Sequence, residues 1–210
     1  MNLENPKKVE EVYFEIIKDR IVKEYFSELR MYDVKTYANS INVCFLCLDL
    51  GSEFALSHEE LTQLAYCAIF HEIGKLNFSS EIFLKEKKTK KEKEIVKEVP
   101  RRAFMSLQHL DYHFESKVVV AINEYHKSLE APRKRIDRRD IRRLDSFERR
   151  KFEPKVHVFA QIVAISILFE KYLLYNKNNP DMICREKIEK YLKKEFLGSD
   201  NLIKKILERI

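Results

Sequence analysis

Apolar residues recur at steps of three and four along most of the chain, which is the periodicity of amphipathic α-helices. The pattern predicts helices over residues 5–30, 32–50, 57–72, 101–110, 116–129, 155–175, 186–196 and 201–210. Gly51 is the expected end of the second helix, and Ser57 with Glu60 is the expected cap of the third. In the lysine-rich connection 79–100, Thr89 and Glu92 can cap a short helix in the same way. No stretch carries a convincing strand pattern, so the fold class is predicted to be all-α.

Length and composition agree with one helical bundle. The chain has 210 residues, 45% of them hydrophobic and only three of them glycine, which suits a helical fold better than a turn-rich β fold. We expect residues 1–30 to form an N-terminal amphipathic helix that packs on a helical domain of residues 31–210. No apolar run reaches the roughly 18 residues of a membrane span, and no signal peptide is evident, so a cytoplasmic protein without a membrane segment is expected.

Four cysteines are present, and Cys44 and Cys47 have Cys-x-x-Cys spacing. Such a pair can be a redox couple or half of a zinc site. No second pair of Cys or His with matching spacing follows, and no βαβ pattern surrounds the pair. Reduced thiols in the core, one helical turn apart, are therefore the favoured interpretation.

The strongest candidate chemistry lies between Ile69 and Leu76, where His71 and Glu72 follow an apolar run and precede Gly74 and Lys75. A buried imidazole and a buried carboxylate both need a partner, and a metal ion is one such partner. Gly74 is expected to let the backbone leave the helix, which would free Lys75 to reach an anion beside the metal.

These residues resemble the His-Asp signature of the HD superfamily of metal-dependent phosphohydrolases, with Glu72 in the place of the aspartate. The likeness continues at 81–85, at 89–92 and at Val99-Pro100, and it is closest to the HD-GYP branch, which hydrolyses cyclic di-GMP. It extends over roughly residues 30–172. The resemblance implies an HD-domain-like helical bundle and, in an intact member, a bridged pair of metal ions that generates hydroxide.

Several positions depart from the family's metal ligands. The resemblance places Arg30, Val99, Tyr125 and Ile167 where the family has ligands, and the Gly-Tyr-Pro signature is missing from 127–132. His71, Glu72 and His126 remain as possible ligands, with Lys75 and Lys85 at the family's lysine positions. The expectation is a degenerate domain with no metal or with one weakly bound Fe, Mn or Zn ion. Two further hypotheses concern one helix face: Asp33 could add a carboxylate, and Arg30 could pair with Glu72 in place of a cation.

Positive charge is concentrated between Ala131 and Lys155, which hold eleven Lys and Arg against five Asp and Glu, a net of +6. A local excess of this kind indicates an anionic partner, and arginine favours phosphate and carboxylate groups. The alternative is a solvated segment with internal pairs between arginine and aspartate. The candidate ligand-binding residues are Lys85 and the arginines of this segment, Arg133, Arg135, Arg138, Arg139, Arg142 and Arg143.

Three functions follow from these observations. The first is a degenerate HD-GYP-like domain, catalytically impaired, that acts as a regulatory or binding module for an anionic ligand, a cyclic dinucleotide or an acidic protein surface. The second is a phosphohydrolase of the cyclic di-GMP phosphodiesterase type, in which His71, Glu72 and His126 hold metal and Lys75 contacts phosphate. The third is nucleic-acid binding through 131–155, for which stacking aromatic residues are sparse. The N-terminal helix could also pair with another copy and form a homo-oligomer.

Overall fold

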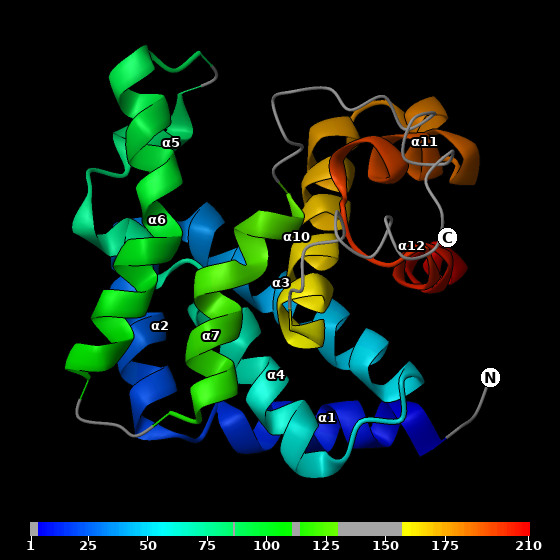
Figure 1. Ribbon diagram of the computed structural model, residues 1–210, viewed down its shortest axis with the longest axis horizontal. Coiled ribbons are helices and arrows are strands. Elements are labelled where there is room, and N and C mark those ends of the chain that lie inside the picture. Colours follow the sequence, from blue (N-terminus) through cyan, green and yellow to red (C-terminus); the bar gives the residue numbers. More distant parts are fainter. Residues whose placement is uncertain (1–3, 86, 111–113, 130–156) are drawn as a thin grey trace, which may run out of the picture. The chain divides into compact units, whose positions relative to one another are not determined.

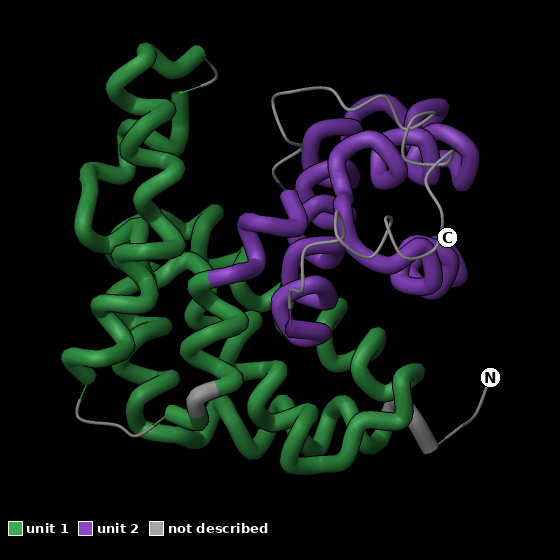
Figure 2. The backbone as a smooth tube through the Cα atoms, in the orientation of Figure 1, with its two compact units in different colours: residues 1–123 green, residues 124–210 purple. Residues whose placement is uncertain are grey.

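The computed structural model describes residues 4–85, 87–110, 114–129 and 157–210. All regular structure in these ranges is helical, and no strand occurs in them, which confirms the predicted all-α class. The chain divides into two compact units, residues 1–123 and residues 124–210 (Figure 2).

The first unit is built from helices that follow one another with short connections (Figure 1). In chain order they are α1 (Glu4–Ile16), α2 (Arg20–Tyr32), α3 (Val34–Glu53), α4 (His58–Phe70), the short 3-10 helix η1 (Ile73–Asn77), α5 (Glu81–Leu84), α6 (Lys90–His109) and α7 (Ser116–Glu124, whose last residue belongs to the second unit).

Helices α3 and α4 form the centre of this unit. They pack against each other, α1 lies against both, and α2 lies against α3 and η1. Gly51, predicted to end α3, lies inside it, and a Cβ atom there would stand 2.8 Å from the Cδ2 atoms of Leu61 and Leu64. The glycine therefore serves the close packing of α3 on α4, and the prediction that it stops the helix is wrong.

The single helix predicted over residues 5–30 is two helices in the structure. The apolar periodicity continues through the break, but the backbone turns at Ile17 to Asp19, where the Asp19 side chain accepts a hydrogen bond from the Ile21 amide and caps α2. An aspartate cap satisfies an amide that has no partner within the helix, which favours a helix start at this point. Periodicity alone missed this start.

Both predicted capping boxes are formed. Ser57 and Glu60 exchange side-chain and backbone hydrogen bonds at the start of α4, and Thr89 and Glu92 do the same at the start of α6. The expected boundary before residue 101 is absent, because α6 continues through Pro100 to His109. Within α6, Val99, Pro100, Ala103 and Leu107 are buried, whereas no residue from 90 to 98 is buried.

Helix α7 packs on α4. The Phe114 ring, just before α7, lies 5.6 Å from the Tyr66 ring and 5.3 Å from the Phe70 ring, measured between centroids. The Cys67 thiol on α4 donates to the carbonyl oxygen of Val118 at 3.9 Å. These contacts bury the end of α4 that leads into His71.

The second unit contains one long apolar helix and several short elements. They are η2 (Tyr125–Ser128), α10 (Val158–Asn176), η3 (Pro180–Met182), α11 (Arg185–Glu195), α12 (Asp200–Ile206) and η4 (Leu207–Arg209). Helix α10 packs against η2, α11 and α12. Two hydrogen bonds fasten the turn before α12, from the Leu197 amide to the Ser128 carbonyl and from the Ser199 amide to Gln161 Oε1.

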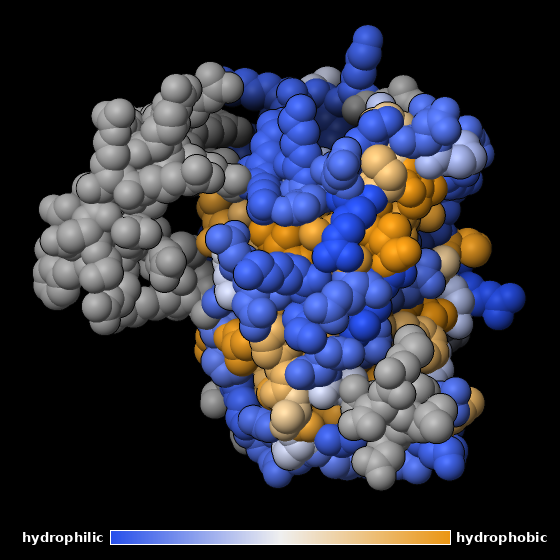
Figure 3. All heavy atoms as spheres, turned by 90° about the vertical axis from the view of Figure 1, so that its right-hand side faces the viewer, coloured by the Kyte–Doolittle hydropathy of each residue, from blue (hydrophilic) through white to orange (hydrophobic). Residues whose placement is uncertain are grey.

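By length and composition, α10 is the one helix in the described ranges that could cross a membrane. Its 18-residue window is 61% buried inside the protein, as in the core helix of a soluble protein. Hydrophilic side chains cover most of the described surface on the face drawn in Figure 3, and hydrophobic ones come to the surface in smaller areas.

Candidate functional site

His71 is the residue at which α4 ends, and its side chain is almost completely enclosed. Its exposed fraction is 1%, and Phe70 before it is fully buried. The ring nitrogen Nδ1 lies 2.6 Å from the Ala68 carbonyl oxygen, one turn back in the same helix. Donation from Nδ1 to this carbonyl fixes the ring and directs Nε2 toward Glu72, whose Oε1 is 3.5 Å away.

Glu72 has a cation as its nearest partner. The Lys75 ammonium lies 2.6 Å from Glu72 Oε1, three residues along the chain in η1. Burial by itself would raise the pKa of the Glu72 carboxyl, but the Lys75 ammonium and the His71 imidazole outweigh it and lower the pKa to about 2. The carboxylate is therefore ionised at neutral pH and is compensated within its own loop.

Gly74 allows this loop to approach α6 closely. A Cβ atom on Gly74 would lie 2.0 Å from the Val99 carbonyl oxygen and 2.6 Å from the Ala103 amide nitrogen. Its φ angle is not in the positive region, so the expected role in releasing the backbone from the helix is not what this glycine does. Its role is contact with the backbone of α6. Sequence reasoning missed this contact.

Two residues at the junction of α2 and α3 share the electrostatic surroundings of Glu72. Burial first, then the charges of Asp33 and Glu72, raise the pKa of Tyr32 to about 12. For Asp33, burial raises the pKa, but hydrogen bonds from Thr36 and the charge of Lys75 lower it overall. The Asp33 carboxylate accepts from both the amide and the hydroxyl of Thr36 at 2.7 Å, because it caps α3.

Arg30 does not take the position proposed for it. Its side chain is exposed, and no acidic side chain among the described residues lies within 4.0 Å of it. The cation beside Glu72 is Lys75, so the hypothesis of an Arg30–Glu72 pair is wrong. Lys75 could have been found from the sequence, because residues three apart are neighbours on a helix.

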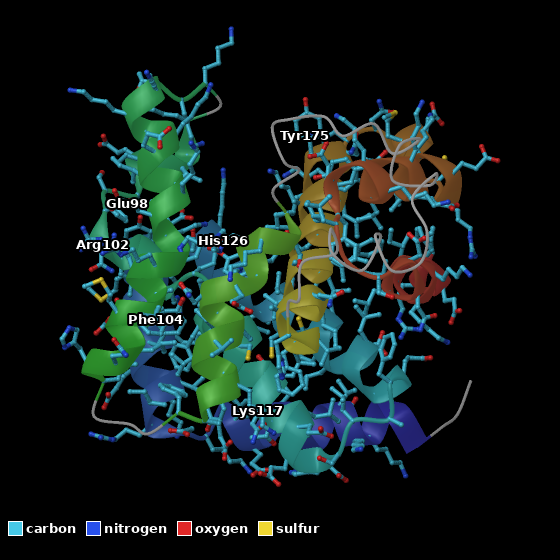
Figure 4. The ribbon with its side chains drawn as sticks, viewed as in Figure 1. Glu98, Arg102, Phe104, Lys117, His126 and Tyr175 are labelled. Atoms are coloured by element: carbon cyan, nitrogen blue, oxygen red, sulfur yellow. The ribbon has the colours of Figure 1, made fainter. Side chains whose placement is uncertain are left out.

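The remaining candidates belong to other elements or fall outside the described residues. Lys85 pairs with Glu92 Oε1 at 2.5 Å, beside the cap of α6. His126 lies on η2 in the second unit (Figure 4), next to the buried Tyr125. The arginines Arg133, Arg135, Arg138, Arg139, Arg142 and Arg143 fall outside the described residues.

The residues of the first unit do not fit a bridged two-metal centre. Among the described residues, no group of three or more His, Cys, Asp or Glu side chains is placed to hold a metal ion. Glu72 Oε2 has no hydrogen-bond partner in the described part of the chain, but an ion at this carboxylate would stand beside the Lys75 ammonium. The loop as arranged carries an ion pair.

The cysteines of the Cys-x-x-Cys pair are core residues. Cys44, Cys47 and Cys67 are fully buried, and none of them forms a disulfide bond within the described residues. Burial raises the pKa values of the Cys44 and Cys67 thiols well above the ordinary value, so these thiols stay protonated. The interpretation as reduced core thiols is confirmed for these side chains.

The chain was also compared with known proteins. No protein-family model matches it, and neither a curated protein nor a solved structure matches it.

Proposed function

We propose that this protein is a degenerate HD-GYP-like domain that works as a regulatory or binding module and does not turn over a phosphodiester. The observation that carries the proposal is the ion pair between Lys75 and Glu72, with 2.6 Å between the ammonium and Oε1. The pair occupies the His71-Glu72 position at which the resemblance expects a metal ligand. A fixed positive charge from the chain takes the place of a metal cation.

Electrostatics support this reading of the site. A divalent ion about 4 Å from an ammonium is repelled by roughly 8 kcal/mol at an effective dielectric constant of about 20. Lys75 lies three residues after Glu72, and its side chain is only 19% exposed, so its ammonium is held near the Glu72 carboxylate. Metal binding at Glu72 would first have to displace that ammonium, and it would then leave Lys75 without its counter-ion.

The module would act in the cytoplasm on an anionic partner, either a cyclic dinucleotide or an acidic protein surface. Support for this part comes from the sequence, in which residues 131–155 carry a net charge of +6. Arginine binds phosphate and carboxylate groups through two parallel hydrogen bonds, so the arginines of this segment suit either partner. A binding titration with cyclic di-GMP, with and without these arginines, separates the two partners.

One assay separates the module from the enzyme. Phosphodiesterase activity on cyclic di-GMP is measured with added manganese or iron for the wild type beside His71→Ala, and the metal content of the wild type purified without chelator is measured in parallel. We expect turnover at the buffer background for both proteins and metal well below one equivalent per chain. Turnover that disappears in His71→Ala, with stoichiometric metal in the wild type, would establish the phosphohydrolase in place of the module.

A further inference from the structure

The first half of α6 extends beyond the packed part of the first unit. Figure 1 shows this half, together with α5, projecting away from the other helices of the unit. The packed half begins at Val99, which is 4% exposed, whereas no residue from 90 to 98 is buried. More than two turns of helix are thus held on one end only, and most of their surface faces solvent.

The projecting half is basic mainly together with the residues that flank it. Residues 90–98 contain four Lys and three Glu, a net of +1, and the wider stretch 85–102 contains nine Lys and Arg and four Glu, a net of +5. We define the α6 basic stripe as Lys90, Lys93, Lys97 and Arg101, all of which are exposed. Lys97 pairs with Glu94 at 2.8 Å, an exposed pair of the kind that contributes little. No acidic side chain among the described residues lies within 4.0 Å of the other three cations.

The spacing of the stripe places four charges on one side of the helix. Steps of three, four and four residues keep them within an arc of about 80°, and they cover about 16 Å along the helix axis at 1.5 Å per residue. Their separation of roughly one turn, about 5 Å, is comparable to the distance between successive phosphates of a nucleic-acid strand. A line of cations at this interval can contact several phosphates at once.

The composition of the stripe favours one kind of partner. A protein interface has an apolar centre, and a helix on a membrane surface has an apolar face beside its cations. The stripe has no continuous apolar face: the two large exposed apolar residues of α6 are Val96, about 60° around the helix from Lys93, and Met105, one turn beyond Arg101, and each is only 38% exposed. Base stacking requires aromatic side chains, and the stripe has none. Lysine, a compact and strongly hydrated charge, suits contacts to phosphates that do not depend on base sequence.

We propose that the α6 basic stripe binds the phosphate backbone of duplex nucleic acid without sequence preference. The stripe shares no residue with the Glu72–Lys75 loop or with the basic segment 131–155. Because each phosphate contact releases counter-ions, four contacts give a slope of about −3.6 for the logarithm of affinity against the logarithm of salt concentration. Raising salt from about 50 to about 200 mM then weakens the binding by about 150-fold through the stripe alone.

The test uses the full chain and a fluorescent random-sequence DNA duplex in anisotropy titrations at several salt concentrations. The stripe variant carries Lys90→Gln, Lys93→Gln, Lys97→Gln and Arg101→Gln. The control variant removes the same charge from exposed positions of α11, with Arg185→Gln, Lys187→Gln, Lys190→Gln and Lys194→Gln. Circular dichroism establishes that both variants keep the helix content of the wild type.

We expect the stripe variant to bind at least tenfold more weakly than the wild type at low salt, with a slope less negative by up to about 3.6, and the control variant to lose less than threefold. Equal losses in the two variants would mean that only net charge matters, and unchanged binding in the stripe variant would place the contacts elsewhere; either result overturns the proposal. Parallel titrations use phosphatidylserine vesicles and polyglutamate. Stripe-dependent binding to either of these, without binding to the duplex, would assign the surface to a membrane or to an acidic protein instead.

Discussion

Replacing Lys75 with methionine tests the ion pair on which the proposed function depends. Methionine keeps much of the apolar stem and removes the ammonium 2.6 Å from Glu72 Oε1. The Glu72 carboxylate would then be buried beside His71 without its principal counter-charge. Because an uncompensated buried charge is costly, we expect the variant to be clearly less stable than the wild type at pH 7.

The magnitude follows from the carboxyl pKa. Its lowering from 4.5 to about 2 corresponds to about 3 kcal/mol of preference for the ionised form in the folded state. Lys75 is the largest favourable contributor to that preference, so most of it is lost with the ammonium. The Lys75 side chain is 19% exposed, which places the effect below that of a fully buried pair. We expect a loss of about 2–3 kcal/mol in the free energy of unfolding.

Urea unfolding followed by circular dichroism measures the loss. Lys97→Met is the matched control, because Lys97 also pairs with a glutamate three residues away, at 2.8 Å on an exposed surface, and should change stability by less than about 0.5 kcal/mol. Glu72→Gln combined with Lys75→Met should recover at least about 1 kcal/mol of the loss, since the buried charge is then gone. A Lys75→Met protein as stable as the wild type, or a double variant whose losses simply add, would refute the reasoning.

Three further predictions concern Glu72, the packed glycines and the cysteines. Because the pKa of Glu72 is about 2 in the folded protein and ordinarily 4.5, its contribution to stability is complete above about pH 4.5 and is lost as the pH falls toward 2. The free energy of unfolding of Glu72→Gln should therefore fall less steeply than that of the wild type over this pH range. Identical pH dependence in the two proteins would contradict this. Gly74→Ala should lower the free energy of unfolding by about 3 kcal/mol, because the added Cβ would lie 2.0 Å from the backbone of Val99. Gly51→Ala should lower it less, because the added Cβ would meet only the ends of leucine side chains, at 2.8 Å. The reverse order in urea unfolding would argue against this packing. A thiol reagent should titrate Cys184 alone in the native protein and all four cysteines after unfolding, and rapid native labelling of a second thiol would count against burial as the protection.

Helix starts were more predictable from the sequence than helix continuity. Ser57 with Glu60 and Thr89 with Glu92 marked two starts correctly, because a capping box depends on four neighbouring residues and on nothing distant. Pro100 was wrongly expected to separate two helices. The helix continues through that proline where Val99 and Ala103 of α6 meet Gly74 of η1, and this long-range contact has no local signal.

The candidate site was predictable in position and only partly in content. The apolar run before His71 indicated burial of His71 and Glu72, and both are buried in the structure. The partner of Glu72 was not foreseen, because the family resemblance directed Lys75 toward a ligand, whereas the structure directs it to the carboxylate three residues before it. The three-residue spacing of Glu72 and Lys75 allowed this pair, but the backbone after α4 ends decides whether the ammonium turns back to the carboxylate, and the sequence does not specify that backbone.

Pro100 affects the local unfolding of α6. Proline has no amide hydrogen, so the Val96 carbonyl lacks its usual donor from within the helix at the very point where the solvated turns meet the packed ones. Pro100 thus divides α6 into a solvated segment before it and a packed segment after it, joined where the helical hydrogen bonding is interrupted. In hydrogen–deuterium exchange, amides before Pro100 should exchange with little protection, whereas those from Ala103 onward should exchange slowly. A molecule bound to the turns before Pro100 could therefore change their conformation without disturbing the loop of Glu72.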